Sequence, residues 1–265
     1  MAEIMRRLME LEADVLYQEP PAPGELAWGI TCGRIPILLS APHAAAHIRD
    51  GRLKEEDEYT AGFVRLVAEM SGAYAMYARR QSTEDPNWPV DSAYKRELGR
   101  LVQGHGLRFV LDVHGAVSHT DFGVALGTIN SQSCPVQFDL ILDTLRQYGL
   151  RRDAEGLNRL DVDDAYSARG AGTITRFSSQ TLGVPAAQFE INGHLRIMER
   201  RDDATKKRGF YGDPWRIENC VRAFVSLVRD LNTSVTHNGT AMSPDEPERS
   251  FPAELSGNPA CGGAG

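Results

Sequence analysis

Apolar positions along the chain follow two spacings, one typical of strands and one typical of helices. Continuous apolar runs bounded by turn formers predict buried strands over residues 35–39, 73–79, 107–115, 122–129 and 184–192. Apolar residues at helical spacing predict helices over residues 1–14, 56–71, 91–106, 135–150 and 214–231, with a short helix near 173–182. Strands that alternate with helices indicate an α/β fold, which we expect to have a mixed, mostly parallel central sheet with helices on both faces.

The same pattern sets the expected domain boundaries. At 265 residues, of which 42% are apolar, the chain is long enough to bury one full-sized core. We expect a single α/β domain over residues 1–232, in which residues 25–43 form a hairpin with its turn near Gly33 and Arg34. Residues 233–265 are rich in Ser, Pro, Gly and Asn and contain few large apolar side chains, so we expect a disordered C-terminal tail.

Charge and composition exclude several classes of partner. The net charge of −7 argues against a broad grip on nucleic acid, which needs a basic face. No stretch approaches the roughly 18 apolar residues of a membrane helix, and the N-terminal segment lacks the apolar core of a signal peptide, so we expect a cytoplasmic protein without membrane contact. The four cysteines never form a CxxC pair, so the sequence does not support a thiolate zinc cluster. A small molecule or peptide is the expected partner.

Two histidines follow the apolar runs that we expect at the centre of the sheet. His43 comes just after residues 35–39 and His114 closes residues 107–115, so both should lie at the same edge of the sheet. The helix after His43 opens with four acidic residues, of which Asp57, with Glu56 as the alternative, can face back toward that edge. Two histidines, one carboxylate and a water form the ligand set of catalytic zinc hydrolases. The sequence therefore predicts one zinc ion per chain.

Two further acidic residues lie in predicted strands. Asp112 should share a strand face with His114, where it can accept the ring N–H of that histidine; the alternative is a buried acid satisfied by main-chain amides. Glu190 interrupts the apolar run 184–192, and a carboxylate there is costly unless it is paired or used. We expect Glu190 to act as a general base; the alternative is a structural ion pair with Arg196.

Five motifs, SAPHAAAH, EEDEYT, EDPNW, LDVHGA and QFEIN, occur in an order that resembles the N-formylglutamate amidohydrolase family. The resemblance spans roughly residues 35–230, and it implies a fold similar to zinc carboxypeptidases and aspartoacylase-like deacylases. It also implies that His43, Asp57 and His114 hold zinc and that Glu190 is the catalytic carboxylate.

The chain departs from the family pattern at two places. Pro42-His43-Ala44-Ala45 stands where the family usually has PHSG, and Trp88 follows Asn87 where closer members have an arginine. That arginine would help to hold an acidic substrate, and another arginine of the chain can supply a guanidinium for this purpose. The candidates for substrate binding are Asn87 together with Arg80, Arg169 and Arg196, and Arg79 is a further possible source of a guanidinium.

The favoured function is a metal-dependent amidohydrolase that cleaves the amide of an N-formyl or N-acyl amino acid or of a short peptide. The alternative is a catalytically silent member of the fold that binds a carboxylate-bearing ligand. A serine hydrolase is not supported, because no G-x-S-x-G nucleophile elbow occurs. Stoichiometric zinc with turnover distinguishes the first two hypotheses.

Overall fold

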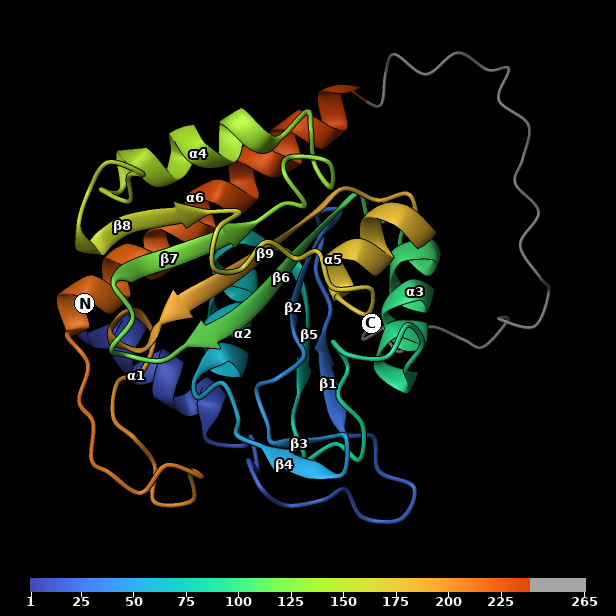
Figure 1. The fold of residues 1–265 in the computed structure, drawn as a ribbon, viewed down its shortest axis with the longest axis vertical. Coiled ribbons are helices and arrows are strands. Elements are labelled where there is room, and N and C mark those ends of the chain that lie inside the picture. The colour runs from blue at the N-terminus through green and yellow to red at the C-terminus, as the bar shows by residue number, and fades with distance from the viewer. Residues whose placement is uncertain (239–265) are drawn as a thin grey trace.

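A seven-stranded sheet forms the centre of the computed structural model, which describes residues 1–238 (Figure 1). The spatial order of the strands is β1-β5-β2-β6-β9-β7-β8, and β5, β2, β6 and β9 run parallel to one another. The flanking strands β1 and β7 are antiparallel to their neighbours β5 and β9. The predicted mixed, mostly parallel α/β sheet is therefore confirmed. The strands are β1 (Trp28–Thr31), β2 (Ile37–Ala41), β5 (Tyr74–Ala78), β6 (Phe109–Ala116), β7 (Phe122–Gly127), β8 (Gly156–Val162) and β9 (Ala186–Asn192).

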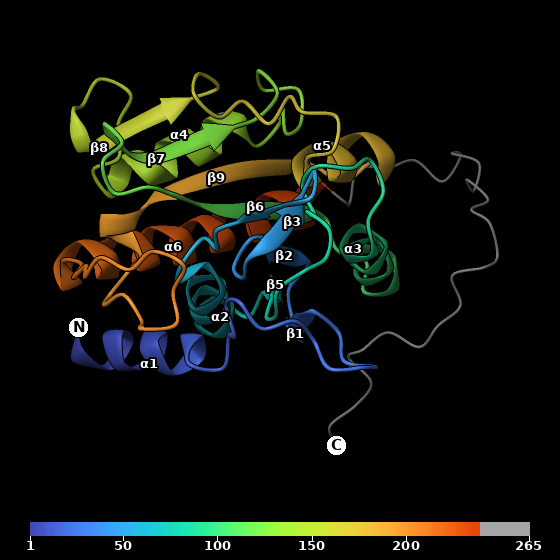
Figure 2. The same cartoon turned by 60° about the horizontal axis from the view of Figure 1, so that its bottom comes forward.

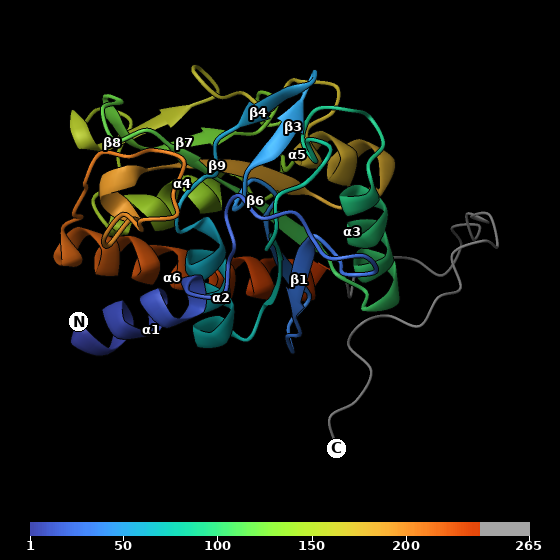
Figure 3. The same cartoon turned by 90° about the horizontal axis from the view of Figure 1, so that it is seen from below.

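Helices cover both faces of the sheet, as expected. Figures 2 and 3 show α1, α2 and α6 grouped on one side and α3 apart from them on the other. The first group and α4 pack on the larger core, whereas α3 and α5 pack on a smaller one. The helices are α1 (Ala2–Glu12), α2 (Thr60–Ser71), α3 (Ala93–Gly104), α4 (Phe138–Gln147), α5 (Ile174–Arg176) and α6 (Pro214–Asn238), with a π-turn η1 (Phe177–Thr181) and a 3₁₀ turn η2 (Gly193–Leu195).

The alternation of side chains along β6 decides which face carries the polar residues. Leu111 and Val113 point into the larger core, whereas Val110 belongs to the smaller core beneath α3 and α5. Because side chains alternate along a strand, Asp112 and His114 share the face of Val110. The polar residues of β6 therefore lie on the side of the smaller core.

The predicted hairpin over residues 25–43 is wrong. Strand β1 pairs antiparallel with β5, which lies between β1 and β2. The expected turn is instead held against the end of the α2–β5 connection, because the amides of Arg34 and Ile35 both donate to the Gly72 carbonyl. A Cβ atom at Gly33 would lie 2.3 Å from the main chain of Ala73, so the glycine permits this close approach. The short hairpin of β3 (His47–Arg49) and β4 (Arg52–Lys54), like β8, has no counterpart among the predicted elements.

The last helix is longer than expected. Helix α6 runs to Asn238, so residues 233–238 are helical and the predicted boundary at 232 is wrong. The reason is that Val235 is 6% exposed and belongs to the larger core, while its carbonyl accepts a hydrogen bond from Arg108 Nη1. The rest of the predicted tail, 239–265, lies outside the described residues. No helix within residues 1–238 combines the length and apolar character needed to cross a membrane.

A buried carboxylate joins α1 to the start of α2. Glu12 is 1% exposed, and its carboxylate accepts hydrogen bonds from the amides of Tyr59 and Gly62 and from the hydroxyl of Tyr17. Tyr59 precedes α2 with a left-handed φ of 63°, so the chain turns sharply there. Burial raises the pKa of Glu12 to about 7, although these hydrogen bonds oppose the rise.

The raised pKa of Glu12 makes a measurable contribution to the pH dependence of stability. The folded protein binds this proton more tightly than the unfolded chain, so its contribution is complete below pH 4.5 and is lost as the pH rises to about 7. We expect the stability of the wild type relative to Glu12→Gln to fall by roughly 3 kcal/mol over that interval, at 1.4 kcal/mol per pKa unit. Urea unfolding of both proteins between pH 4.5 and 8 measures the difference, and a constant difference would contradict the assignment.

Candidate metal centre

Three polar side chains from distant parts of the sequence meet at the carboxyl edge of the sheet. Strands β2 and β6 are neighbours with Ser40 opposite Asp112, so His43, just beyond β2, lies near His114 at the end of β6. The loop before α2 is tied to the same place, because the amide of Asp57 donates to the His43 carbonyl over 2.7 Å. The sequence-predicted neighbours His43, Asp57 and His114 are thus brought together.

The donor atoms of these residues form a compact triangle. His43 Nδ1 lies 3.1 Å from His114 Nδ1 and 3.8 Å from Asp57 Oδ2, and His114 Nδ1 lies 3.4 Å from the same oxygen. Tetrahedral zinc with bonds of 2.0–2.2 Å places its ligands about 3.3–3.6 Å apart. The size and chemistry of this donor set therefore fit a zinc ion, and the three residues could hold one.

Each histidine of the triangle is bound through its other nitrogen to a buried carboxylate. His43 Nε2 lies 2.8 Å from Asp85 Oδ1, and His114 Nε2 lies 3.1 Å from Asp112 Oδ1. If the carboxylates accept the ring N–H groups, both Nδ1 atoms face each other with their lone pairs. Two such nitrogens 3.1 Å apart require a shared proton or a shared cation, because lone pairs repel.

The ionisation of the two histidines differs. Burial lowers the pKa of His43 to about 4, against the effect of Asp85. Burial also opposes protonation of His114, but the charge and hydrogen bond of Asp112 outweigh it and raise the pKa of His114 well above its usual value. Burial likewise opposes the ionisation of Asp57, yet the hydrogen bond to His114 and the nearby His43 lower its pKa to about 2.

The carboxylate of Asp112 lies where the sequence predicts. It is fully buried and takes hydrogen bonds from His114 and from the hydroxyl of Thr175, at 3.2 Å. Within residues 1–238 no main-chain amide donates to it, so the alternative of an acid satisfied by amides does not describe this residue.

Glu56, the alternative ligand considered from the sequence, is not part of the donor set. Its carboxylate accepts hydrogen bonds from the amide and the hydroxyl of Thr205, at 2.7 and 2.6 Å. The physical reason is that successive loop residues point in different directions, so only Asp57 faces the histidines. The structure therefore favours Asp57, the first choice from the sequence, over its alternative Glu56.

Asp85 and His47 are polar residues of this site that sequence reasoning missed. Asp85 is 2% exposed and binds His43 Nε2, the amide of Asn87 and Nε of Arg49. Burial alone would raise the pKa of Asp85, but its contacts with His43 and His47 hold that pKa well below the usual range. The signal available from the sequence was Asp85 itself, an acid within the motif EDPNW.

His43, His47 and Asp85 also place donor atoms within 4.8 Å of one another, but their geometry does not suit a second ion. The rings of His43 and His47 are stacked, with centroids 4.1 Å apart and planes inclined by only 13°. Lone pairs of imidazole lie in the ring plane, so those of two stacked rings run parallel and cannot converge on one cation. His47, which is buried with Nε2 3.3 Å from Asp85, supports the His43–Asp85 pair instead.

Glu190 lies beside His114 on the neighbouring strand β9. The two residues are opposite each other in the parallel register and share a face, and Gln188 Nε2 donates to the Glu190 carboxylate over 3.0 Å. Burial raises the pKa of Glu190 to about 7; Asp57 and Asp112 add to the rise and His114 opposes it. A carboxyl group with this pKa can both accept and donate a proton near neutral pH.

Arg196, the alternative partner of Glu190, makes other contacts. Its Nη1 donates to the carbonyls of Ala116 and Ile191, both at 3.0 Å, and the side chain is 2% exposed. A Cβ atom at Gly115 would lie 2.3 Å from Arg196 Nη2, so the guanidinium lies against the face of β6 opposite to His114. Among the described residues, Glu190 and Arg196 form no ion pair within 4.0 Å.

Of the four residues expected to bind substrate, Asn87 is the one that contacts the donor triangle, through His114. Its Nδ2 lies 3.4 Å from His114 Nε2, and its Oδ1 accepts a hydrogen bond from the amide of Ile174 at the start of α5. Arg80 is bound by Glu25 and Glu19, whereas Arg169 is exposed and donates to Asn130. With Arg196 buried against main-chain carbonyls, the structure does not bring these three arginines to the donor triangle.

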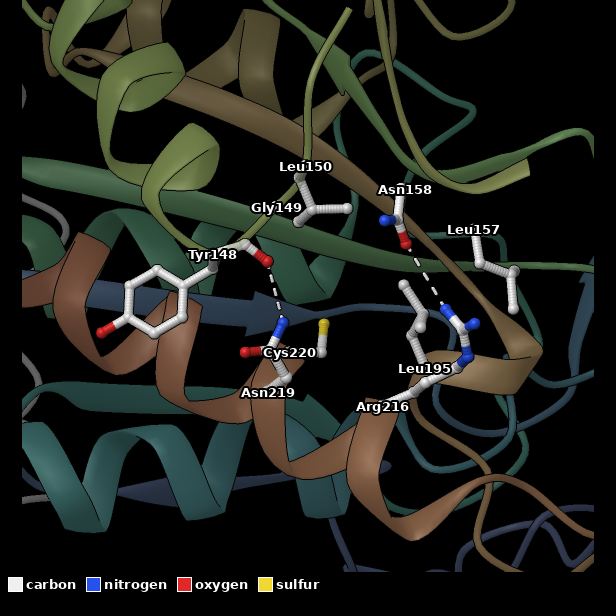
Figure 4. A pocket seen from close by; sticks show the side chains of 9 residues that line it. All are labelled: Tyr148, Gly149, Leu150, Leu157, Asn158, Leu195, Arg216, Asn219 and Cys220. Atoms are coloured by element: carbon white, nitrogen blue, oxygen red, sulfur yellow. Dashed lines mark hydrogen bonds between the residues drawn. The ribbon is translucent and has the colours of Figure 1, made fainter. Parts of the chain in front are cut away.

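A separate small pocket, with a cavity volume of about 40 Å³, lies between the end of α4, β8 and α6 (Figure 4). Asn219 spans one side of it by donating to the Tyr148 carbonyl at 2.9 Å, and Arg216 spans another through Asn158. No histidine or carboxylate lines this pocket, so it shares no chemistry with the donor triangle.

Comparison with known proteins identifies the fold. No protein-family profile matches this chain, and no curated protein matches it in sequence. Similar solved structures include N-formylglutamate amidohydrolase from Ralstonia eutropha JMP134, with a TM-score of 0.52 and 15% identity over 80% of this chain and 100% of that chain. They also include gene product Atu2144 from Agrobacterium tumefaciens, with a TM-score of 0.52 and 12% identity over 83% of this chain and 99% of that chain. The chain therefore has the fold that its motifs suggested.

Proposed function

We propose that this chain is a zinc-dependent amidohydrolase that cleaves the amide bond of an N-formyl or N-acyl amino acid or of a short peptide. The observation that carries the proposal is the pair of Nδ1 atoms of His43 and His114, 3.1 Å apart, with Asp57 beside them and a carboxylate behind each ring. The similarity in fold to an N-formylglutamate amidohydrolase supports the proposed class of substrate.

His43, His114 and Asp57 would hold one zinc ion, while Asp85 and Asp112 fix the orientation and tautomer of the two rings. Zinc bound there would polarise the scissile carbonyl and increase the acidity of a water molecule. The loop and strand ends that carry the donors are held by the Asp57–His43 main-chain hydrogen bond and by the β2–β6 register.

Glu190 is the proposed general base. Its carboxylate takes a proton from the attacking water and then passes it to the nitrogen of the leaving amine, so the group returns to its starting state. The position opposite His114 and the raised pKa both support this role. Asn87, which contacts His114 and the start of α5, is the residue proposed to orient the substrate beside the cluster.

Zinc content and turnover test the proposal together. We expect about one zinc per chain by elemental analysis, and hydrolysis of at least one member of a panel of N-formyl and N-acetyl amino acids. Removal of the metal by a chelator should abolish hydrolysis, and added zinc should restore it. A metal-free protein that binds these compounds without hydrolysing them would instead indicate a catalytically silent binding protein.

A further inference from the structure

Arg49, in β3, lies one carboxylate away from the donor triangle of His43, Asp57 and His114. Its two terminal nitrogens are hydrogen-bond donors that no described residue of the protein occupies. Its Nε donates to Asp85, the carboxylate that also holds His43. Its guanidinium carbon lies 4.8 Å from the centre of the Trp88 ring. Within the described part of the chain, neither terminal nitrogen of Arg49 has a hydrogen-bond or ion-pair partner, and the side chain is 29% exposed.

The position of this guanidinium is fixed by the protein. Asp85, which is almost fully buried, holds one end of the planar group, and the ring of Trp88 covers one of its faces. An arginine restrained in this way loses little conformational freedom when it binds a ligand, so more of the interaction contributes to affinity.

The carboxylates around the donor triangle explain why an unoccupied guanidinium such as that of Arg49 is useful for binding an anionic substrate. Asp57, Asp85, Asp112 and Glu190 all lie at this edge of the sheet, so their negative charge offsets part of the attraction that the proposed zinc ion would exert on an anionic substrate. The other arginines considered for this task are occupied, because Arg80 is paired with glutamates and Arg196 binds main-chain carbonyls. Arg49 supplies a cation with unused donors one carboxylate away from His43.

We propose that Arg49 selects substrates that carry a carboxylate close to the amide bond to be cleaved, by donating from its two terminal nitrogens to that carboxylate. This inference rests on the proposed amidohydrolase function. The substrate class follows from the geometry, since the paired N–H groups of a guanidinium match the two oxygens of a carboxylate.

The test compares two substrates that differ in charge, N-formyl-L-glutamate and its diamide, on the zinc-loaded full chain. Arg49→Ala should lower the ratio of kcat/KM for the acid to kcat/KM for the diamide by about ten- to a hundredfold, the loss expected for a charged hydrogen bond. Arg49→Lys should restore part of the ratio. Because both substrates meet the same metal centre, the ratio is unaffected by any change in zinc affinity that follows from disturbing Asp85.

Arg146→Ala is the matched control, because it removes an exposed arginine from α4 that pairs with Asp143 away from the cluster. Its ratio should equal that of the wild type. An equal loss for both substrates in Arg49→Ala would overturn the proposal, since it would show that Arg49 acts only through Asp85 and His43.

Binding distinguishes failure of this inference from failure of the proposed function. Calorimetric titration of zinc-loaded Glu190→Gln with the same two compounds reads selectivity without turnover. If the wild type hydrolyses no member of the panel, the proposed function fails, but tighter binding of the acid that is lost in Glu190→Gln/Arg49→Ala still supports the role of Arg49. Absence of any preference for the acid, in binding and in turnover, overturns it.

Discussion

Replacement of Glu190 by glutamine should lower kcat by about 10²–10⁴-fold while zinc content and melting temperature stay close to those of the wild type. Glutamine keeps the size of the side chain and can still contact Gln188, but it cannot accept the proton that the reaction releases. The loss corresponds to roughly 3–6 kcal/mol of activation free energy. Steady-state kinetics with the best substrate of the panel, together with elemental analysis, measure the effect.

Gln188→Ala is the matched control for this prediction, because it removes the hydrogen bond to Glu190 and leaves the carboxylate in place. Its kcat should fall far less than that of Glu190→Gln. A Glu190→Gln protein that turns over at a near-normal rate but melts earlier would show that the carboxylate is structural.

Replacement of His114 by alanine should weaken zinc binding by at least about a hundredfold. The variant loses one of three protein ligands, whereas changes to the partners that orient ligands typically cost 10- to 100-fold. We therefore expect Asp112→Asn to fall between the wild type and His114→Ala. Competition with a chromogenic chelator measures the affinities, and excess zinc should restore part of the activity of both variants.

His105→Ala is the control for the loss of a histidine, because His105 follows α3 and contacts Tyr74 rather than the cluster. Its zinc affinity should match that of the wild type. Unchanged zinc affinity in His114→Ala would contradict the proposed ligand set and with it the proposed metal centre.

The main features of the fold could be predicted because they depend on local patterns. Residues 107–115 contain the continuous apolar run 109–111, as expected for a strand covered on both faces, and the structure has β6 there. The helix expected over 91–106 begins as α3 directly after Ser92, a residue type that caps helices, and the Ser92 side chain accepts a hydrogen bond from the amide of Lys95. The hairpin failed because β5, a distant segment, pairs with β1 more favourably than β2 does.

The site could be predicted only where strand ends define it. His43 and His114 follow apolar runs, so their meeting at one edge follows from the parallel sheet. Arg49 and His47 gave no such signal, because they belong to a three-residue strand whose packing over the cluster depends on tertiary contacts with Asp85. Glu56 and Asp57 could not be separated for a related reason, since loop side chains have no fixed period.

The way in which the donor triangle is supported has a consequence for the order of assembly. His43 lies in the loop after β2, Asp57 in the loop before α2 and His114 in β6. Each stretch is held by protein contacts, including those of Asp85, Asp112 and Glu12. On the proposed function, these protein contacts would form the donor triangle before zinc binds, in contrast to zinc fingers, which are unfolded without their metal. Zinc binding would then be a late and reversible step. Newly made chains would accumulate as a folded, zinc-free population, and the zinc supply rather than folding would set how many of them are active.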